Sequence, residues 1–190
     1  MTKIIAFAGR KQSGKSSSAK FLMDTYPDKD IRIYSFATPL KQLCVDILGL
    51  DPRQCYGEDK HKNEKVDCYW EGKQLTGREV MQIVGTEWFR TMQNNVWASA
   101  TIRKIQKDSP EIALIDDCRF PNEVDAVKDV GGLVFKMERS MYYSDHASEV
   151  ALDRAHYDQL NFTSVIMNQY MDLEAKNETI IRILTQKGIL

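Results

Sequence analysis

Residues 9–16 have the sequence GRKQSGKS and match the phosphate-binding pattern G-x-x-x-x-G-K-[ST] at every specified position. Glycines in such a loop let backbone N–H groups point toward a phosphate, and the helix that follows contributes the positive end of its dipole. Lys15 would supply a charge to the β- and γ-phosphates, and the Ser16 hydroxyl would coordinate Mg²⁺. The pattern predicts a nucleoside triphosphate site; the alternative is an ordinary glycine- and serine-rich turn between a strand and a helix.

Two adjacent acids and an arginine form a second candidate. Asp116, Asp117 and Arg119 follow the apolar run at 112–115. Because successive side chains of a strand point to opposite faces, one of the two aspartates is expected to face Mg²⁺ or the acceptor phosphoryl group, and the other to cap or pair locally. Arg119 offers a planar guanidinium for bidentate contact with a phosphate. The alternatives are two solvated acids in a turn and a surface ion pair.

The segment 78–90, with the sequence REVMQIVGTEWFR, is a third candidate. A helix would place Arg78 and Gln82 on one face, and Gly85 would interrupt it at a cost of about 1 kcal/mol relative to alanine. Close approach of the backbone to a ligand would explain this glycine, and so would a kink needed for packing. Trp97, further along the chain, could stack on a nucleobase or belong to the core.

A polar segment at 138–159 contains Arg139, Arg154 and the run DHASE at 145–149. A mobile lid of this kind would carry arginines over the transferring phosphates, exclude water and offset developing negative charge. A solvated charged helix is the alternative, and His146 alone is no evidence for acid–base catalysis.

Five short apolar runs must position these residues as strands, and helical patterns alternate with them. The strands are expected at residues 3–8, 31–35, 112–116, 133–137 and 164–167. The helices are expected directly after the glycine-rich loop and at about 38–48, 78–89, 95–107, 121–130 and 172–186. The alternation predicts a doubly wound α/β sheet, in which the carboxyl ends of parallel strands bring ligand-binding residues to one rim.

Residues 51–74 depart from this pattern, since they are rich in charged and turn-forming residues and poor in aliphatic ones. They are expected to form a flexible insert after the second helix. The predicted organisation is a single domain over residues 1–190. Its core spans about 1–50 and 108–190, with an inserted segment at about 51–107 and a lid at about 138–159.

The composition excludes several classes of protein. The chain has 190 residues, 26 Lys and Arg against 27 Asp and Glu, and a formal net charge of −1. This balance argues against a nucleic acid or an anionic membrane as a partner. The absence of an apolar run of roughly 18 residues and of a visible signal peptide favours a cytoplasmic protein. The four cysteines lack zinc-site spacing and are expected to be free thiols; they are Cys44, Cys55, Cys68 and Cys118.

Four blocks of this sequence resemble the bacteriophage deoxynucleoside monophosphate kinases, and the resemblance covers nearly the whole chain. The blocks are 9–17, 77–87 with Trp97, 117–123, and 145–149 followed by Asn168. The loop at 9–17 would identify only a superfamily. Together with R-x-x-x-Q-x-x-G-T at 78–86 and D-x-R-F-P-N-E at 117–123, the match becomes specific.

The resemblance implies an NMP-kinase-like fold. This is a three-layer α/β/α P-loop domain with a five-stranded mostly parallel sheet, a helical insert that binds the monophosphate, and a lid. It also implies Mg²⁺-dependent transfer of the γ-phosphoryl group of ATP to a deoxynucleoside 5′-monophosphate, giving the diphosphate for DNA precursor synthesis. The substrate is a small molecule, and the compartment is the host cytoplasm if a phage encodes the chain. Whether the chain forms a homodimer is left open.

The expected site residues fall into four sets. ATP is expected to bind at Lys11, Gln12, Ser13, Gly14, Lys15, Ser16 and Ser17, and Mg²⁺ at Ser16 and Asp117. The catalytic residues are expected to be Lys15, Asp117, Arg119 and Arg139. The acceptor is expected to bind at Lys41, Arg78, Gln82, Gly85, Thr86, Arg90, Trp97 and Arg119.

The sequence departs from the family at Ser16 and Ser17, where some phage members carry an Asp-Thr pair; this leaves Asp116 or Asp117 as the metal-facing carboxylate. The insert at 51–74 is shorter than in some members, so neither base preference nor ribose discrimination can be carried over. Two alternatives remain: a kinase for another phosphorylated small molecule, such as dephospho-coenzyme A or phosphomevalonate, and a non-catalytic nucleotide-binding module. The sequence lacks the guanine-reading Asn-Lys-x-Asp motif that a GTPase would need.

Overall fold

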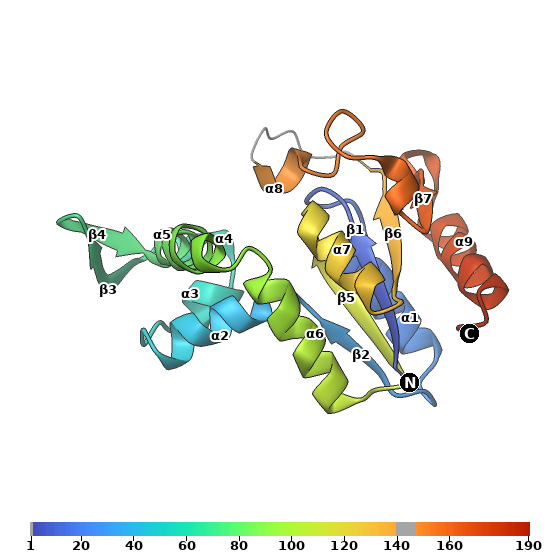
Figure 1. Cartoon of the computed structure of the whole chain (residues 1–190), viewed down its shortest axis with the longest axis horizontal. Coiled ribbons are helices and arrows are strands. Elements are labelled where there is room, and N and C mark those ends of the chain that lie inside the picture. Colours follow the sequence, from blue (N-terminus) through green and yellow to red (C-terminus); the bar gives the residue numbers. More distant parts are fainter. Residues whose placement is uncertain (1, 140–146) are drawn as a thin grey trace. The chain divides into compact units, whose positions relative to one another are not determined.

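The computed structural model describes residues 2–139 and 147–190, and the chain divides into two compact units. The first unit comprises Met1–Phe36 and Ile102–Leu190, and the second comprises Ala37–Thr101. Helix α6 (Val96–Asp108) contains the point in the sequence at which the chain passes from the second unit to the first. Figure 1 labels the elements of both units, which are described separately below.

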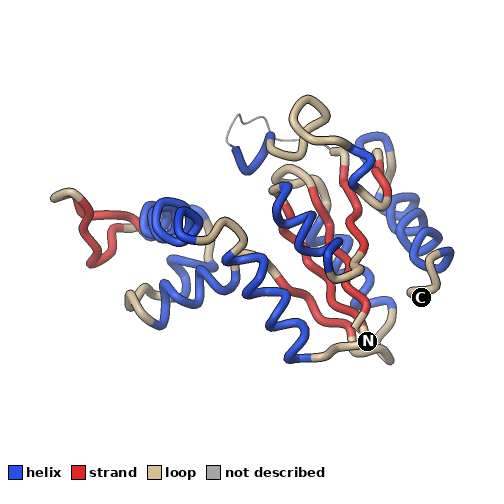
Figure 2. The backbone as a smooth tube through the Cα atoms, in the orientation of Figure 1, coloured by secondary structure: helices blue, strands red, loops and turns tan. Residues whose placement is uncertain are grey.

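The first unit is built on a five-stranded sheet in which all paired strands are parallel (Figure 2). The strand order is β2-β5-β1-β6-β7. The strands are β1 (Lys3–Ala8), β2 (Ile31–Tyr34), β5 (Ile112–Cys118), β6 (Leu133–Met137) and β7 (Ser164–Ile166). The predicted α/β fold and all five predicted strands are confirmed.

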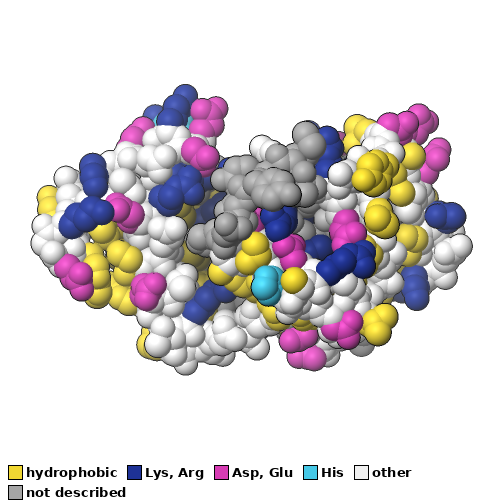
Figure 3. All heavy atoms as spheres, turned by 90° about the horizontal axis from the view of Figure 1, so that it is seen from above, with side chains coloured by type: hydrophobic (Ala, Val, Ile, Leu, Met, Phe, Trp, Pro, Cys, Tyr) yellow, Lys and Arg dark blue, Asp and Glu magenta, His cyan; other side chains and the backbone are white. Residues whose placement is uncertain are grey.

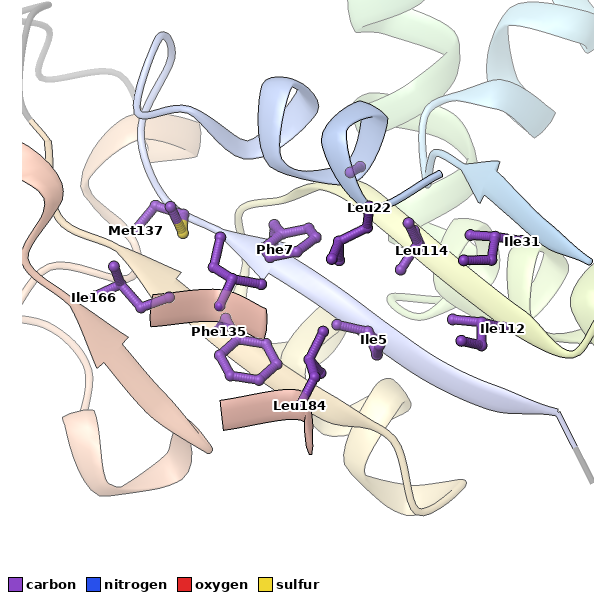
Figure 4. Packing of buried hydrophobic residues seen from close by; sticks show 12 residues of the cluster. Ile5, Phe7, Leu22, Ile31, Ile112, Leu114, Phe135, Met137, Ile166 and Leu184 are labelled. Atoms are coloured by element: carbon purple, nitrogen blue, oxygen red, sulfur yellow. The ribbon is translucent and has the colours of Figure 1, made fainter. Parts of the chain in front are cut away.

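Helices cover both faces of this sheet. On one face, α1 (Lys15–Thr25) and α9 (Leu173–Gln186) contribute apolar side chains to a core that contains Ile5 and Phe7, which share a face of β1. Figure 4 shows Phe7, Leu22 and Leu114 meeting within this core. Helix α7 (Pro121–Asp129) also packs on β1 and β6, but none of its residues belongs to that core. It therefore covers the opposite face, which completes the three layers.

Strand β5 continues two residues further than predicted, so Asp117 and Cys118 lie inside the strand together with Asp116. The register with β1 shifts at this point, because Ala6 pairs with Ile115 whereas Ala8 pairs with Cys118. Three steps along β5 thus match two steps along β1. The extra residue is a β-bulge, a feature that re-aims the side chains of the bulged strand.

The described parts of the first unit also contain three short elements. They are α8 (Ala147–Val150) and two 3₁₀ turns, η2 (Gln159–Asn161) and η3 (Asn168–Tyr170). The predicted lid at 138–159 includes α8. Its residues 140–146, with Asp145 and His146, lie outside the described residues.

The second unit is helical with one hairpin. It contains α2 (Thr38–Asp46), α3 (Pro52–Tyr56), α4 (Asp59–Lys62), the antiparallel strands β3 (Lys65–Trp70) and β4 (Lys73–Thr76), α5 (Gly77–Gln82) and the π-helix η1 (Ile83–Arg90). Its core is formed by Cys44, Leu50, Cys55, Val66, Leu75, Val80 and Val84.

The prediction of a flexible insert at 51–74 is wrong, because short capping and turn signals organise this polar stretch. The Asp51 carboxylate accepts a hydrogen bond from the backbone N–H of Arg53 at 2.8 Å and caps α3, which begins at Pro52. Glu71 and Gly72 have φ angles of 49° and 77°, as a tight two-residue hairpin turn requires.

No helix within the described ranges is long and apolar enough to cross a bilayer. The face seen in Figure 3 carries lysine and arginine side chains interspersed with aspartate and glutamate side chains. This agrees with the formal net charge of −1.

Candidate active site

The glycine-rich loop joins β1 to α1 and has the backbone shape of a phosphate-binding loop. Gly9 and Gly14 have φ angles of 139° and 98°, and Gly14 is the N-cap of α1. A Cβ at Gly9 would lie 2.7 Å from the backbone oxygen of Met137, so only glycine fits there. The loop therefore depends on both glycines, and the start of α1 faces any anion that it holds.

A cavity of about 440 Å³ opens over this loop. It is lined by Lys11, Gln12, Ser13, Gly14, Lys15, Ser16, Ser17, Asp116, Asp117, Arg119 and Arg139. The structure thus brings together all seven residues predicted to bind ATP and all four predicted catalytic residues. They come from three separate parts of the sequence, which the parallel sheet carries to one rim.

Lys15 is nearly buried, with 6% of its surface exposed. Its Nζ donates hydrogen bonds to the backbone oxygens of Gly9 at 2.8 Å and Arg10 at 2.6 Å. Burial, and after it the nearby Arg119 guanidinium, lower the pKa of Lys15 to about 8. Among the described residues, no carboxylate forms an ion pair with Lys15, so its charge is available to an incoming phosphate.

Asp116 and Asp117 both line the cavity, at the β-bulge that interrupts the alternation of side chains along β5. As expected, one of them meets the predicted metal ligand Ser16, and the other pairs locally. Their partners differ. The Asp117 carboxylate accepts hydrogen bonds from the Ser35 hydroxyl and, at 2.7 Å, from the backbone N–H of Phe36. Asp117 therefore holds the end of β2.

Asp116 is the carboxylate that meets Ser16. Burial raises the pKa of the Asp116 carboxyl, and the hydrogen bond from Ser16 opposes this shift. The prediction placed Mg²⁺ at Ser16 and Asp117, whereas the structure pairs Ser16 with Asp116. No group of three His, Cys, Asp or Glu within the described residues could hold a metal unaided. A hydroxyl and one carboxylate nevertheless fit Mg²⁺, which takes its other ligands from water and nucleotide phosphates.

The sequence did not reveal that Glu149 contacts this site. This residue of α8 is 8% exposed. One of its carboxylate oxygens pairs with the Arg119 guanidinium, and the other accepts a hydrogen bond from the backbone N–H of Lys11 at 2.6 Å. Both donors belong to the cavity over the loop. The Glu149 carboxylate therefore accepts hydrogen bonds from two donors that a phosphate would also use.

Glu123 fixes the backbone of Arg119. Its carboxylate accepts hydrogen bonds from the N–H groups of Arg119 at 2.7 Å and Phe120 at 3.1 Å. The block D-x-R-F-P-N-E thus contains its own support: Glu123 caps the start of α7 and orients the residue that carries the guanidinium.

A second cavity of about 410 Å³ shares Arg139 with the first and was not predicted. It is lined by Arg10, Lys136, Met137, Glu138, Arg139, Asp153, Arg154, Ala155, Met167, Gln169 and Tyr170. The two charged pairs at its wall are Arg10 with Asp153 and Arg154 with Glu138. The lid arginine Arg154 therefore lies at this second cavity, not at the first.

Several predicted acceptor residues lie on α2, α5 and η1 of the second unit. Arg78 and Gln82 are one helical turn apart in α5, as predicted, and Arg78 donates hydrogen bonds to Asn63 at 3.1 Å and to Asp59 at 2.8 Å. Lys41 in α2 places its Nζ 5.1 Å from the centre of the Tyr56 ring. Thr86 is exposed, and Arg90 is half-buried.

For Gly85 and Trp97, the structure supports a role in packing, which was the alternative to contact with a ligand. A Cβ at Gly85 would lie 2.6 Å from a methyl carbon of Leu40. The indole N–H of Trp97 donates a hydrogen bond to the Gly85 oxygen at 3.0 Å, and its ring lies 5.2 Å from that of Phe89. Trp97 is only 6% exposed. Both residues therefore serve the core of the second unit, and the prediction that they contact the acceptor gains no support.

Comparison with known proteins decides the family. No family model matches the chain. A protein of Acanthamoeba polyphaga mimivirus, provisionally named deoxynucleotide monophosphate kinase, is 33% identical over 165 residues, which cover 78% of this chain and 81% of that protein. The chain belongs to the deoxynucleoside monophosphate kinase family. The deoxynucleoside-5′-monophosphate kinase of Escherichia phage T5 is also similar, with 25% identity over an alignment of 244 positions, gaps included, that covers 92% of this chain and 98% of the phage protein.

Family membership confirms the resemblance inferred from the four blocks. In this kinase two further contacts to the loop were missed. Asn168, which follows β7, donates a hydrogen bond to the Ser13 oxygen at 2.9 Å, and Lys176 of α9 places its Nζ 3.3 Å from the Ser17 hydroxyl oxygen. Asn168 belongs to one of the four blocks that resemble the family. The sequence around Lys176 contains no pattern that predicts its contact with Ser17.

The cysteines of this kinase are free, as predicted. Cys118 is completely buried at the end of β5, and burial raises its pKa well above the ordinary value. A thiol in this state is a poor nucleophile, so Cys118 fills space beside the site.

Proposed function

We propose that this protein transfers the γ-phosphoryl group of ATP to the 5′-phosphate of a deoxynucleoside monophosphate, with Mg²⁺ as the metal. The observation that carries the proposal is the single cavity in which the P-loop, two aspartates and two arginines converge. Phosphoryl transfer needs positioning and cancellation of negative charge more than covalent chemistry. An acceptor phosphate is already anionic, so no general base is required.

The donor triphosphate is proposed to lie along the loop from Lys11 to Ser17. Lys15 would leave its two carbonyl partners and bind the β- and γ-phosphates. The adjacent 410 Å³ cavity would take the nucleoside of ATP, because Met137, Met167 and Tyr170 offer apolar and aromatic surface beside Arg139.

Ser16 and Asp116 would hold the metal ion, whose role is to neutralise charge on the β- and γ-phosphate oxygens. Arg119 and Arg139 would bind the transferring group, since both guanidinium groups line the cavity. Asp117 would act indirectly, by keeping the end of β2 in place. Its proposed catalytic role is thus one of positioning.

The acceptor is proposed to bind through Arg119 and through polar residues of the second unit, Lys41, Arg78, Gln82, Thr86 and Arg90. Family membership and the R-x-x-x-Q-x-x-G-T block support this assignment. The cytoplasm is the proposed compartment. The substrate is proposed to be a small molecule rather than a nucleic acid, in line with the near-zero net charge.

A coupled assay of ADP release tests the proposal. The acceptors are the four common deoxynucleoside monophosphates, modified pyrimidine monophosphates, dephospho-coenzyme A and phosphomevalonate. We expect turnover with at least one deoxynucleoside monophosphate and its loss by orders of magnitude in a folded Lys15→Met variant. Turnover only with the other acceptors would favour a different small-molecule kinase, and nucleotide binding without any turnover would indicate a non-catalytic module.

A further inference from the structure

Lys176 is a buried lysine that the proposed reaction does not use. It lies in the first turn of α9 and is only 3% exposed. Its Nζ lies 3.3 Å from the Ser17 hydroxyl oxygen. Within the described residues no carboxylate forms an ion pair with it, and burial followed by the charge of Arg139 lowers its pKa.

This position is unfavourable for a cation in two respects. A buried ammonium group without an anionic partner loses hydration that a single hydroxyl does not replace. The first turn of a helix also carries the positive end of the helix dipole, which repels a lysine. Neither cost is offset by a described protein group, so an anion from outside the protein is the natural partner.

The surroundings of Gly14 show where Lys176 lies relative to the phosphate-binding loop. A Cβ placed on Gly14 would lie 3.3 Å from the Asn168 amide nitrogen, 3.7 Å from the Ser17 hydroxyl oxygen and 3.9 Å from Lys176 Nζ. The Ser17 hydroxyl in turn donates a hydrogen bond to the Gly14 oxygen at 3.0 Å. The ammonium group of Lys176 therefore stands directly behind the turn at which α1 begins.

We propose that Lys176 is a second cation of the donor-phosphate site, which holds the Ser17 hydroxyl and adds positive charge behind the turn from Gly14 to Ser17. The inference rests on the proposed function for the identity of the anion, a nucleoside di- or triphosphate. Lys176 is a positioning residue, because it reaches the phosphates through Ser17 and through its field. It contributes equally to binding of ADP and ATP, whereas Lys15 also serves the transfer step.

The test compares Lys176→Met with Arg182→Met, which removes the same charge from an exposed position of the same helix. Calorimetric titration with ADP and ATP is done without any acceptor. We expect both dissociation constants to rise about tenfold in Lys176→Met and to stay unchanged in Arg182→Met. We also expect kcat to change less than KM for ATP, and the melting temperature of the nucleotide-free protein to stay equal or rise.

A third variant, Lys176→Gln, keeps a hydrogen-bond donor near Ser17 without the charge. It is expected to bind ADP more weakly than wild type, and Lys176→Arg is expected to restore most of the affinity. Unchanged ADP affinity in folded Lys176→Gln, or a lower melting temperature with unchanged affinity, would overturn the proposal and make Lys176 a structural residue. Failure of the proposed function gives a different result, namely wild-type protein that binds ATP but phosphorylates no acceptor.

Discussion

At the scale of single residues, Glu149 is the side chain whose contacts bear most directly on nucleotide binding. Its carboxylate accepts from the Lys11 N–H and pairs with Arg119, as a phosphate oxygen would. The hydrogen-bond donors with which a P-loop binds an anion need a partner when no nucleotide is bound, because buried polar groups are rarely left without one. A side-chain carboxylate satisfies them here, and an incoming nucleotide must displace it or be repelled by it.

Replacing Glu149 by glutamine therefore should strengthen ATP binding. The amide oxygen can still accept from Lys11, but the negative charge next to the phosphates is removed. We expect the dissociation constant for ATP to fall by about fivefold, which corresponds to about 1 kcal/mol. Titration calorimetry measures this, with Glu178→Gln on an exposed position of α9 as the control. Weaker binding would contradict the prediction and show that Glu149 mainly orients Arg119.

At the scale of elements, the start of α5 depends on a capping box. The Thr76 hydroxyl accepts a hydrogen bond from the Glu79 N–H at 3.2 Å, and the Glu79 carboxylate accepts one from the Thr76 N–H at 2.8 Å. Lys73 also donates to Glu79, at 2.7 Å. The hydrogen bond from Lys73, followed by that from the Thr76 N–H, lowers the pKa of Glu79 to about 2.

This shift makes stability depend on pH in a defined direction. The folded pKa of Glu79 is below its ordinary value of 4.5, so the stabilisation is complete above that value and is lost as the pH falls toward 2. We expect Glu79→Gln to melt a few degrees below wild type at neutral pH, and the difference to shrink below pH 4.5. Thermal melts followed by circular dichroism check this, with the exposed Glu87→Gln as control. A difference independent of pH would contradict it.

The π-helix η1 explains the glycine that the sequence left ambiguous. Predicted as part of one helix over 78–89, this stretch changes from α to π hydrogen bonding at Ile83. Gly85 lets α2 approach through Leu40, while its carbonyl oxygen accepts from Trp97. π-helical segments are rare and occur mostly as single turns within α-helices, and this one contains the glycine that both Leu40 and Trp97 contact.

Gly85→Ala tests this packing. Alanine would gain about 1 kcal/mol in helix propensity but would place its Cβ against Leu40, and overpacking of this kind costs about 1–3 kcal/mol. We expect a net loss of about 1 kcal/mol in the free energy of unfolding. In the Gly85→Ala/Leu40→Ala double variant the loss should be smaller than the sum of the single losses. Additive losses in urea denaturation would show that the two residues do not interact.

At the scale of the whole molecule, the two units divide the predicted roles. The residues assigned to ATP and the metal all belong to the first unit, and the residues assigned to the acceptor, apart from Arg119, belong to the second. Substitutions in the second unit are therefore expected to affect acceptor binding and leave nucleotide binding unchanged.

Arg78→Gln tests this division of labour. We expect KM for the deoxynucleoside monophosphate to rise at least tenfold, because a guanidinium proposed to bind the acceptor is lost. KM for ATP should stay within a factor of about two. Arg53→Gln is the matched control, since Arg53 is an exposed arginine of the same unit and is also paired with an aspartate, Asp51. Equal increases in both KM values would refute the assignment.

Much of the architecture was predictable, because strand periodicity, the loop pattern and the alternation of elements are local signals. The five parallel strands and the residues that line the 440 Å³ cavity were predicted on this basis. Three features could not be predicted from the sequence, because they depend on contacts that form only in the folded chain. Asp116 rather than Asp117 meets Ser16 at the bulge in β5, capping and turn residues order the 51–74 segment, and Glu149 and Lys176 reach the loop from distant segments.

The most direct test of the central claim follows the phosphoryl group itself. ATP radiolabelled at the γ-phosphate is incubated with the protein, Mg²⁺ and each deoxynucleoside monophosphate, and the products are separated by chromatography. The account predicts label in the deoxynucleoside diphosphate for at least one acceptor, and none with the Lys15→Met variant. If the wild-type protein binds ATP but no deoxynucleoside diphosphate becomes labelled, the claim that this chain is a deoxynucleoside monophosphate kinase is contradicted.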